Sequence, residues 1–157
     1  MRLDYRTTLP EASQAMSGLE QVVSASTLEP ALRELVKLRA SQINGCAYCI
    51  DMHTKDARAM GEDEERLHLV SAWREAPSFS PRERAALAWT EALTLLADTG
   101  APDDAYDAMA AEFDPAEQVA LTLAIIAING WNRLAVGFRQ PVGSYVSHRH
   151  PVAAAAG

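Results

Sequence analysis

Residues 30–60 read PALRELVKLRASQINGCAYCIDMHTKDARAM. The Asn44-Gly45 pair interrupts this stretch, because glycine readily adopts the left-handed backbone that ends helices. Apolar residues before the pair recur at the spacing of one helix face: Leu32, Leu35, Val36 and Leu38. The stretch therefore predicts two helices, over 30–43 and 46–60, that form an antiparallel hairpin.

The rest of the chain is also typical of helices. Alanine supplies 29 of the 157 residues, and strand-type alternation of β-branched residues is almost absent. Further helices are predicted over 10–24, 62–75, 81–97, 102–113 and 115–138. We expect an all-α fold, with a single compact domain over residues 1–157, about six to seven helices and a peripheral tail over 139–157.

The charge balance excludes one class of partner. Fourteen Lys and Arg oppose 21 Asp and Glu, which gives a formal net charge of −7, so we expect no nucleic-acid binding. The N-terminus lacks the apolar core of a signal peptide, and no unbroken apolar run in a predicted helix approaches the ~18 residues of a membrane span. We therefore expect a cytoplasmic protein without a membrane segment.

The last predicted helix carries an unusual surface. Residues 119–128 are apolar on every side except at Thr122. A helix without a polar face must be covered all round, and a domain this small covers such a helix incompletely. We therefore predict that part of this helix lies against another copy of the chain in a homo-oligomer.

The two cysteines form a C-x-x-C pair, Cys46 and Cys49. The pair closes too short a loop to staple a domain, so a catalytic, redox or metal-binding role is favoured over a structural one. A zinc site would need all of Cys46, Cys49, His53 and Glu34, because there is no second cysteine pair. Ile50 stands where c-type haem attachment needs histidine, and no βαβ pattern indicates a thioredoxin fold. No metal or organic cofactor is expected.

Helix geometry adds a base and a carboxylate to the pair. On a helix that turns 100° per residue, Cys46, Cys49 and His53 lie at about 0°, 300° and 340°, so one narrow stripe carries all three. His53 is one turn from Cys49 but roughly 10.5 Å of axial rise from Cys46. In the hairpin, residue numbers at one level sum to about 89, which brings Glu34 within reach of His53. A dithiol, a base and an orienting carboxylate are what nucleophilic thiol chemistry requires.

The same residues resemble a known family. The spacing E-x11-C-x2-C-x3-H over residues 34–53 is similar to the core motif of the carboxymuconolactone decarboxylase-like superfamily, in its AhpD-like (alkylhydroperoxidase D) branch. The resemblance implies a helical bundle, a trimer or hexamer, a hydroperoxide substrate and a thiol or dithiol reductant. It makes Cys49 the peroxide-attacking thiol, Cys46 the resolving thiol, and His53 with Glu34 the proton relay. AhpD enzymes carry a histidine between the cysteines, where this chain has Tyr48.

Two physical effects favour different cysteines as the thiol that attacks the peroxide. Cys46 lies nearer the helix start, where the dipole lowers a thiol pKa, but this effect is worth only about 0.3–1 kcal/mol, less than tenfold in rate. A positioned base contributes ~10²- to 10⁴-fold, and His53 is one turn from Cys49 alone. We therefore assign peroxide attack to Cys49.

Thiol chemistry and resemblance together predict an oxidoreductase, a cysteine-based peroxidase or a disulfide reductase that serves antioxidant defence. Decarboxylases of the same superfamily lack the cysteine pair, so the chain resembles them in fold and not in chemistry. Two alternatives stay open at this point. One is a redox-sensing or scaffold protein whose dithiol switches with little turnover, and the other is a decarboxylase-like enzyme that acts on an aromatic-pathway lactone.

Overall fold

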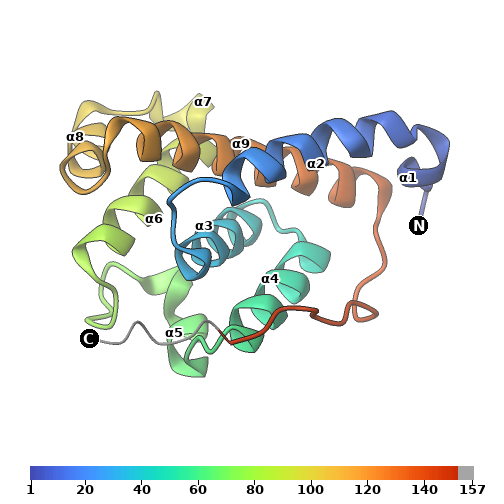
Figure 1. The fold of residues 1–157 in the computed structure, drawn as a ribbon, viewed down its shortest axis with the longest axis horizontal. Helices are drawn as coiled ribbons and strands as arrows, with labels where there is room; N and C mark the ends of the chain where they lie inside the picture. The colour runs from blue at the N-terminus through green and yellow to red at the C-terminus, as the bar shows by residue number, and fades with distance from the viewer. Residues whose placement is uncertain (152–157) are drawn as a thin grey trace.

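The computed structural model describes residues 1–151, which form nine α-helices, one 3-10 helix and no β-strand (Figure 1). In chain order they are α1 (Tyr5–Thr8), α2 (Pro10–Ser24), α3 (Pro30–Ile43), α4 (Ala47–Ala59), α5 (Glu64–Leu69), the 3-10 helix η1 (Val70–Ala72), α6 (Pro81–Thr94), α7 (Leu96–Thr99), α8 (Asp103–Glu112) and α9 (Pro115–Phe138). The all-α prediction is confirmed, and α3 with α4 is the predicted hairpin.

The helix count is higher than predicted because two helices are single turns. The four-residue α1 is capped by Asp4, and α7 is separated from α6 where Leu95 leaves helical geometry. Such turns are too short for an apolar period to reveal. The predicted helix over 62–75 also ends early as α5 and tightens into η1, which lets both Val70 and Trp73 reach the core.

Helix α3 is the centre of the fold, since it packs against α4, α6 and α9, while α2 runs along α9 (Figure 1). One buried cluster joins α3 to α6, α8 and α9 through Leu32, Val36, Trp89, Met109, Phe113, Leu121 and Ile125. A second joins α3 to α4, η1 and α6 through Leu35, Leu38, Ala57, Val70, Trp73 and Leu87. Each fully buried side chain of this kind contributes about 1.5–3 kcal/mol. With both of its sides buried, α3 holds Glu34 in a fixed position.

Helix α9 is the long apolar helix of the sequence. Within residues 1–151 it is the one helix long and apolar enough to cross a membrane by length and composition, and half of its most apolar window is buried inside the fold. Its inner side packs on the core through Leu121, Ile125 and Ile128. Its outer side leaves Val119 and Ile126 exposed at 69% and 53%. The apolar surface that led to the oligomer prediction is therefore half covered by this chain itself.

Candidate active site

The turn between α3 and α4 places Cys46 at the start of α4. Gly45 has a left-handed backbone (φ +64°), so the chain reverses within two residues, and the Cys46 backbone N–H donates to the Ser41 carbonyl at 3.0 Å. Cys46 is the N-cap of α4 rather than its first residue, and its Sγ accepts a hydrogen bond from the Cys49 backbone N–H at 3.3 Å. This end of the helix stabilises negative charge on the Cys46 sulfur.

The two cysteines are bonded to each other in the structure. Their Cα atoms are 5.3 Å apart, which is within the usual range for disulfides, so the i, i+3 spacing closes without displacing the helix. Both side chains are buried, and they pack against Ile128 and Ala135 of α9. The cysteine pair is therefore buried in the core and is not exposed at the surface.

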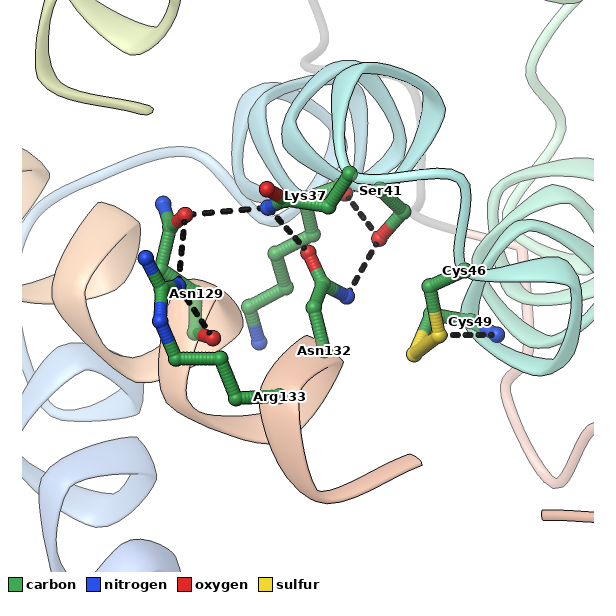
Figure 2. The surroundings of a disulfide bond; sticks show 8 residues. Lys37, Ser41, Cys46, Cys49, Asn129, Asn132 and Arg133 are labelled. Carbon is green, nitrogen blue, oxygen red and sulfur yellow. Dashed lines mark hydrogen bonds between the residues drawn. A yellow bond between two sulfur atoms is a disulfide. The ribbon is translucent and has the colours of Figure 1, made fainter. Parts of the chain in front are cut away.

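A network of amides holds the turn on α9 (Figure 2). The Asn44 side-chain amide donates to Asn129 Oδ1 and to Asn132 Oδ1, both at 2.9 Å. Asn132 in turn donates to Ser41 Oγ at 3.1 Å. Asn132 is almost fully buried, so losing a partner here would leave an unsatisfied polar group in the core. The network fixes the register of the turn that carries Cys46.

His53 and Glu34 meet across the hairpin. His53 Nδ1 lies 2.7 Å from Glu34 Oε2, and both side chains are at most 5% exposed. Because an ionised carboxylate only accepts hydrogen bonds, Nδ1 is the donor in this contact. His53 Nε2 is buried and has no hydrogen-bond partner among residues 1–151. That nitrogen is left to accept a proton when the ring is neutral.

The charge of Glu34 is set by opposing effects. Burial raises the pKa of this carboxyl, but the hydrogen bond from His53 and the charges of His53, Lys37 and Arg149 outweigh burial and leave the pKa below its ordinary value. Lys37 is itself buried and forms an ion pair with Glu20 at 2.5 Å. Glu34 is therefore ionised at neutral pH and can orient the imidazole.

A pocket of about 490 Å³ opens on these groups. Cys49, His53 and Glu34 all line it, together with Tyr48, Met52 and Trp131. Its volume is within the range of pockets that bind small organic molecules. Cys46 is not among its lining residues. The structure thus brings together all four residues that the sequence singled out, and one of the two cysteines, Cys49, lines this pocket.

The C-terminal segment lies over the same pocket. The sequence predicted a peripheral tail over 139–157, of which 152–157 lie outside the described residues. Residues 145–149, here called the C-terminal strap, instead run back along α4 (Figure 1). Tyr145 and Arg149 of the strap line the pocket. This part of the tail therefore belongs to the site.

One buried carboxylate anchors the strap. Asp56 Oδ1 accepts hydrogen bonds from the Tyr145 hydroxyl at 2.8 Å and from the Ser147 hydroxyl at 2.6 Å. Burial and the neighbouring Asp56 raise the pKa of Tyr145, so this hydroxyl remains a donor at neutral pH. Arg149 lies 3.7 Å from Asp56 Oδ2 and 4.0 Å from Glu34 Oε1. The strap thus adds a positive charge beside the His53–Glu34 pair.

Of two strap-contact residues, Asp56 and Tyr145, the sequence carried a signal for Asp56 only. Asp56 follows His53 by three residues and so continues the stripe of Cys46, Cys49 and His53, which is a signal that sequence reasoning passed over. Tyr145 gave no local signal, because it comes from an irregular segment 89 residues away from Asp56.

The groups that could have formed a metal site are engaged with one another. The two sulfurs are bonded together, and His53 Nδ1 is held by Glu34. Within residues 1–151, no group of three or more His, Cys, Asp or Glu side chains is placed to hold a metal ion. What these residues supply by themselves is thiol and acid–base chemistry.

Comparison with known proteins places the chain in a family. The family model described as "Carboxymuconolactone decarboxylase family" matches residues 10–92, which include α3, α4 and the cysteine pair. The chain is 42% identical over 135 residues to the uncharacterized protein YdfG of Bacillus subtilis (strain 168), and the match covers 86% of this chain and 92% of that protein. Its similarity to YdfG thus extends over nearly the whole of both chains.

Solved structures share the fold. A protein of unknown function from Agrobacterium tumefaciens, proposed to be the antioxidant defence protein AhpD, is 49% identical with a TM-score of 0.88, over 92% of this chain and 99% of that one. The debrominase Bmp8 has a TM-score of 0.79 at 17% identity, over 88% of this chain and 74% of that one, so it shares the fold alone. The chain belongs to the carboxymuconolactone decarboxylase family, in its AhpD-like branch.

Proposed function

We propose that this protein is a cysteine-based peroxidase of the alkylhydroperoxidase type, which reduces hydroperoxides with electrons from a thiol or dithiol and so serves antioxidant defence. One observation carries the proposal: Cys49 and the buried His53–Glu34 pair line the same pocket. The family and the C-x-x-C pair support a redox role in general. We further propose a role in the reaction for each of Cys49, Cys46, His53 and Glu34.

The first step oxidises Cys49. His53 Nε2 takes the thiol proton, while Glu34 holds the other ring nitrogen and stabilises the imidazolium. The thiolate attacks the terminal peroxide oxygen, the O–O bond breaks, and Cys49 becomes a sulfenic acid. The alkoxide that leaves takes the proton from His53 and departs as an alcohol.

The second step closes the pair. The Cys46 sulfur attacks the sulfur of the Cys49 sulfenic acid, an S–S bond forms, and the hydroxyl leaves with the Cys46 proton as water. A Cα separation of 5.3 Å lets this happen within one chain. A thiol reductant then returns both sulfurs to thiols.

The test is peroxide consumption by catalytic amounts of protein with dithiothreitol as donor. Many turnovers per chain are expected, and mass spectrometry of the peroxide-treated protein should show the loss of two hydrogens per chain. A single disulfide per chain without turnover would instead favour the redox-sensing alternative. Intact thiols after peroxide treatment would remove the peroxidase proposal.

We also propose that the chain is a homo-oligomer that covers the outer side of α9. Val119 and Ile126 are large apolar side chains exposed on that side of the helix. Light scattering at micromolar concentration is expected to give a multiple of the 17.0 kDa chain, and Ile126→Glu is expected to lower that mass. A 17.0 kDa particle for the unmodified chain would contradict the proposal.

A further inference from the structure

The two cysteines of the pair line different cavities. Cys49 lines the pocket of about 490 Å³ that holds His53 and Glu34. Cys46 lines a separate cavity of about 330 Å³, between the start of α4 and the end of α9. Tyr48 and Ala135 line both cavities and so stand between them. The disulfide therefore joins a residue of one cavity wall to a residue of the other.

The two cavities differ in charge. The larger pocket is lined by three carboxylates, Glu20, Glu34 and Asp56, and by the cations Arg6, Lys37 and Arg149. The cavity at Cys46 is lined by no carboxylate, and its charged residue is Arg139. Arg139 makes no ion pair or side-chain hydrogen bond within residues 1–151. Of the three cations in the larger pocket, Lys37 and Arg149 lie beside carboxylates, while Arg6 lies over the Tyr5 ring. A thiolate entering at Cys46 thus meets an uncompensated positive charge.

Arg139 is held at this cavity by an unusual backbone. It caps the end of α9 in the left-handed conformation (φ +57°), which glycine adopts more readily than any residue with a side chain. Most of the other side chains that line the cavity are apolar, among them Ala47, Val136 and Val142, and Gln140 adds one amide. Apolar walls and one cation suit a thiolate on a small apolar body.

We propose that the cavity at Cys46 is the binding site of the reductant, a small thiol or dithiol with an apolar body that attacks Cys46 Sγ as its thiolate. This inference rests on the proposed peroxidase function. Hydroperoxide and reductant then reach the pair from opposite sides, and neither has to leave before the other enters.

The reduction balances as two thiol–disulfide exchanges. The reductant thiolate forms an S–S bond with Cys46, the Cys46–Cys49 bond breaks, and the electron pair stays on Cys49, which shares its pocket with the imidazole that can return its proton. The second thiol of a dithiol then attacks the reductant sulfur that is bonded to Cys46. A disulfide forms within the reductant, and Cys46 is released as a thiolate. That thiolate is stabilised by the Cys49 backbone N–H, which already points at the Cys46 sulfur. The two reductant protons end on Cys46 and Cys49.

The test separates the two half-reactions. Protein oxidised to the disulfide with diamide is mixed with dithiothreitol to give the rate of reduction, and reduced protein is mixed with peroxide to give the rate of oxidation. Arg139→Gly removes the cation and suits the left-handed backbone, and Val136→Asp adds a negative charge at the cavity from an exposed position. Each should slow reduction about three- to tenfold, as loss or addition of one charge near a reacting thiolate predicts, and leave oxidation unchanged.

Two controls match these variants. Arg139→Lys keeps the charge and should restore most of the reduction rate, and Val22→Asp adds the same charge at an exposed position outside both cavities and should change neither rate. Reduction at the unmodified rate in both Arg139→Gly and Val136→Asp would overturn the proposal. Because diamide makes the disulfide, the result does not depend on peroxidase activity.

The attacked sulfur can be identified directly. Acid quenching of the disulfide form shortly after mixing with a monothiol should leave an adduct within the peptide of residues 40–55, and fragmentation between the cysteines should place it on Cys46. An adduct on Cys49 would overturn the assignment, whatever the outcome of the peroxide assay.

Discussion

The candidate site has a floor and a cover that are held in different ways. The floor is the α3–α4 hairpin, where Glu34 and His53 are buried among core side chains on two regular helices. The cover is the C-terminal strap, an irregular segment whose hydroxyl donors and one cation converge on Asp56. Groups fixed by a packed core move little. A segment held by a few polar contacts, two of them to one carboxylate and one from Lys55 to the Tyr145 carbonyl, can be loosened by one substitution. Changes in the floor should therefore alter the chemistry, and changes in the cover should alter access to it.

The largest effect is expected at the floor, from Cys49→Ser. A serine hydroxyl has too high a pKa to replace the thiolate, so peroxide reduction should fall by roughly 10³-fold or more. In Cys46→Ser, by contrast, peroxide should still give one dimedone-trappable sulfenic acid, at Cys49, although turnover should stop. Faster dimedone labelling of Cys46 in the Cys49→Ser variant would reverse the assignment of the two sulfurs.

His53→Ala should have the next largest effect. It removes the proposed base but leaves the thiol in place, so the rate of peroxide attack at neutral pH should fall by about 10²- to 10⁴-fold. Glu34→Gln should cost less, because the carboxylate acts only through the imidazole. Stopped-flow measurement of thiol loss gives both rates. Equal losses in the two variants would mean that Glu34 also acts on the substrate directly.

Glu34 should also make the stability of the floor depend on pH. Its pKa is lowered in the folded protein, so its stabilising effect is present above the ordinary glutamate pKa and is lost as the pH falls toward the lowered value. The natural chain and Glu34→Gln should be compared below about pH 5, because the histidines of the unfolded chain are already protonated there. The difference in free energy of unfolding between the natural chain and Glu34→Gln should shrink from about pH 5 to pH 3 in denaturant titrations. A constant difference would contradict the ion pair.

The floor could be predicted from the sequence, and the cover could not. Glu34, Cys46, Cys49 and His53 lie within twenty residues on two periodic helices, so helix geometry alone brought them together. The strap has no period, and its contacts with Asp56 join residues 89 and 91 positions apart. Such contacts depend on where α9 ends and how the chain turns after it.

The separation of the two cavities could not be predicted from the sequence either. The i, i+3 spacing puts both cysteines on one helix face, which suggests that they share one environment. Cys46 is instead the cap outside the first turn, and α9 packs across the pair at Ala135. Which cysteine lines which cavity follows from that packing, not from the spacing.

Release of the cover should have a moderate effect. Asp56→Ala removes the acceptor of both strap hydroxyls, so the free energy of unfolding should fall by about 1–3 kcal/mol. The amides of residues 145–149 should exchange with deuterium faster, and KM for an organic hydroperoxide should change more than kcat. Ser147→Ala is the matched control, since it removes one of the two donors and should give a smaller change in each measurement. Unchanged exchange in Asp56→Ala would show that the strap is held by other contacts.

The smallest effect is expected from Arg149→Gln. Its guanidinium is 54% exposed and lies 4.0 Å from Glu34, so the pair contributes at most about 1 kcal/mol, and activity at neutral pH should change less than about threefold. Its charge helps to lower the pKa of Glu34, as the weakest of the causes. Removing it should therefore raise that pKa slightly and move the acid limb of the pH–rate profile to higher pH, and Arg149→Lys should move it back. A loss of tenfold or more at neutral pH would mean instead that Arg149 contacts the substrate, and the strap would then belong with the floor as part of the chemistry.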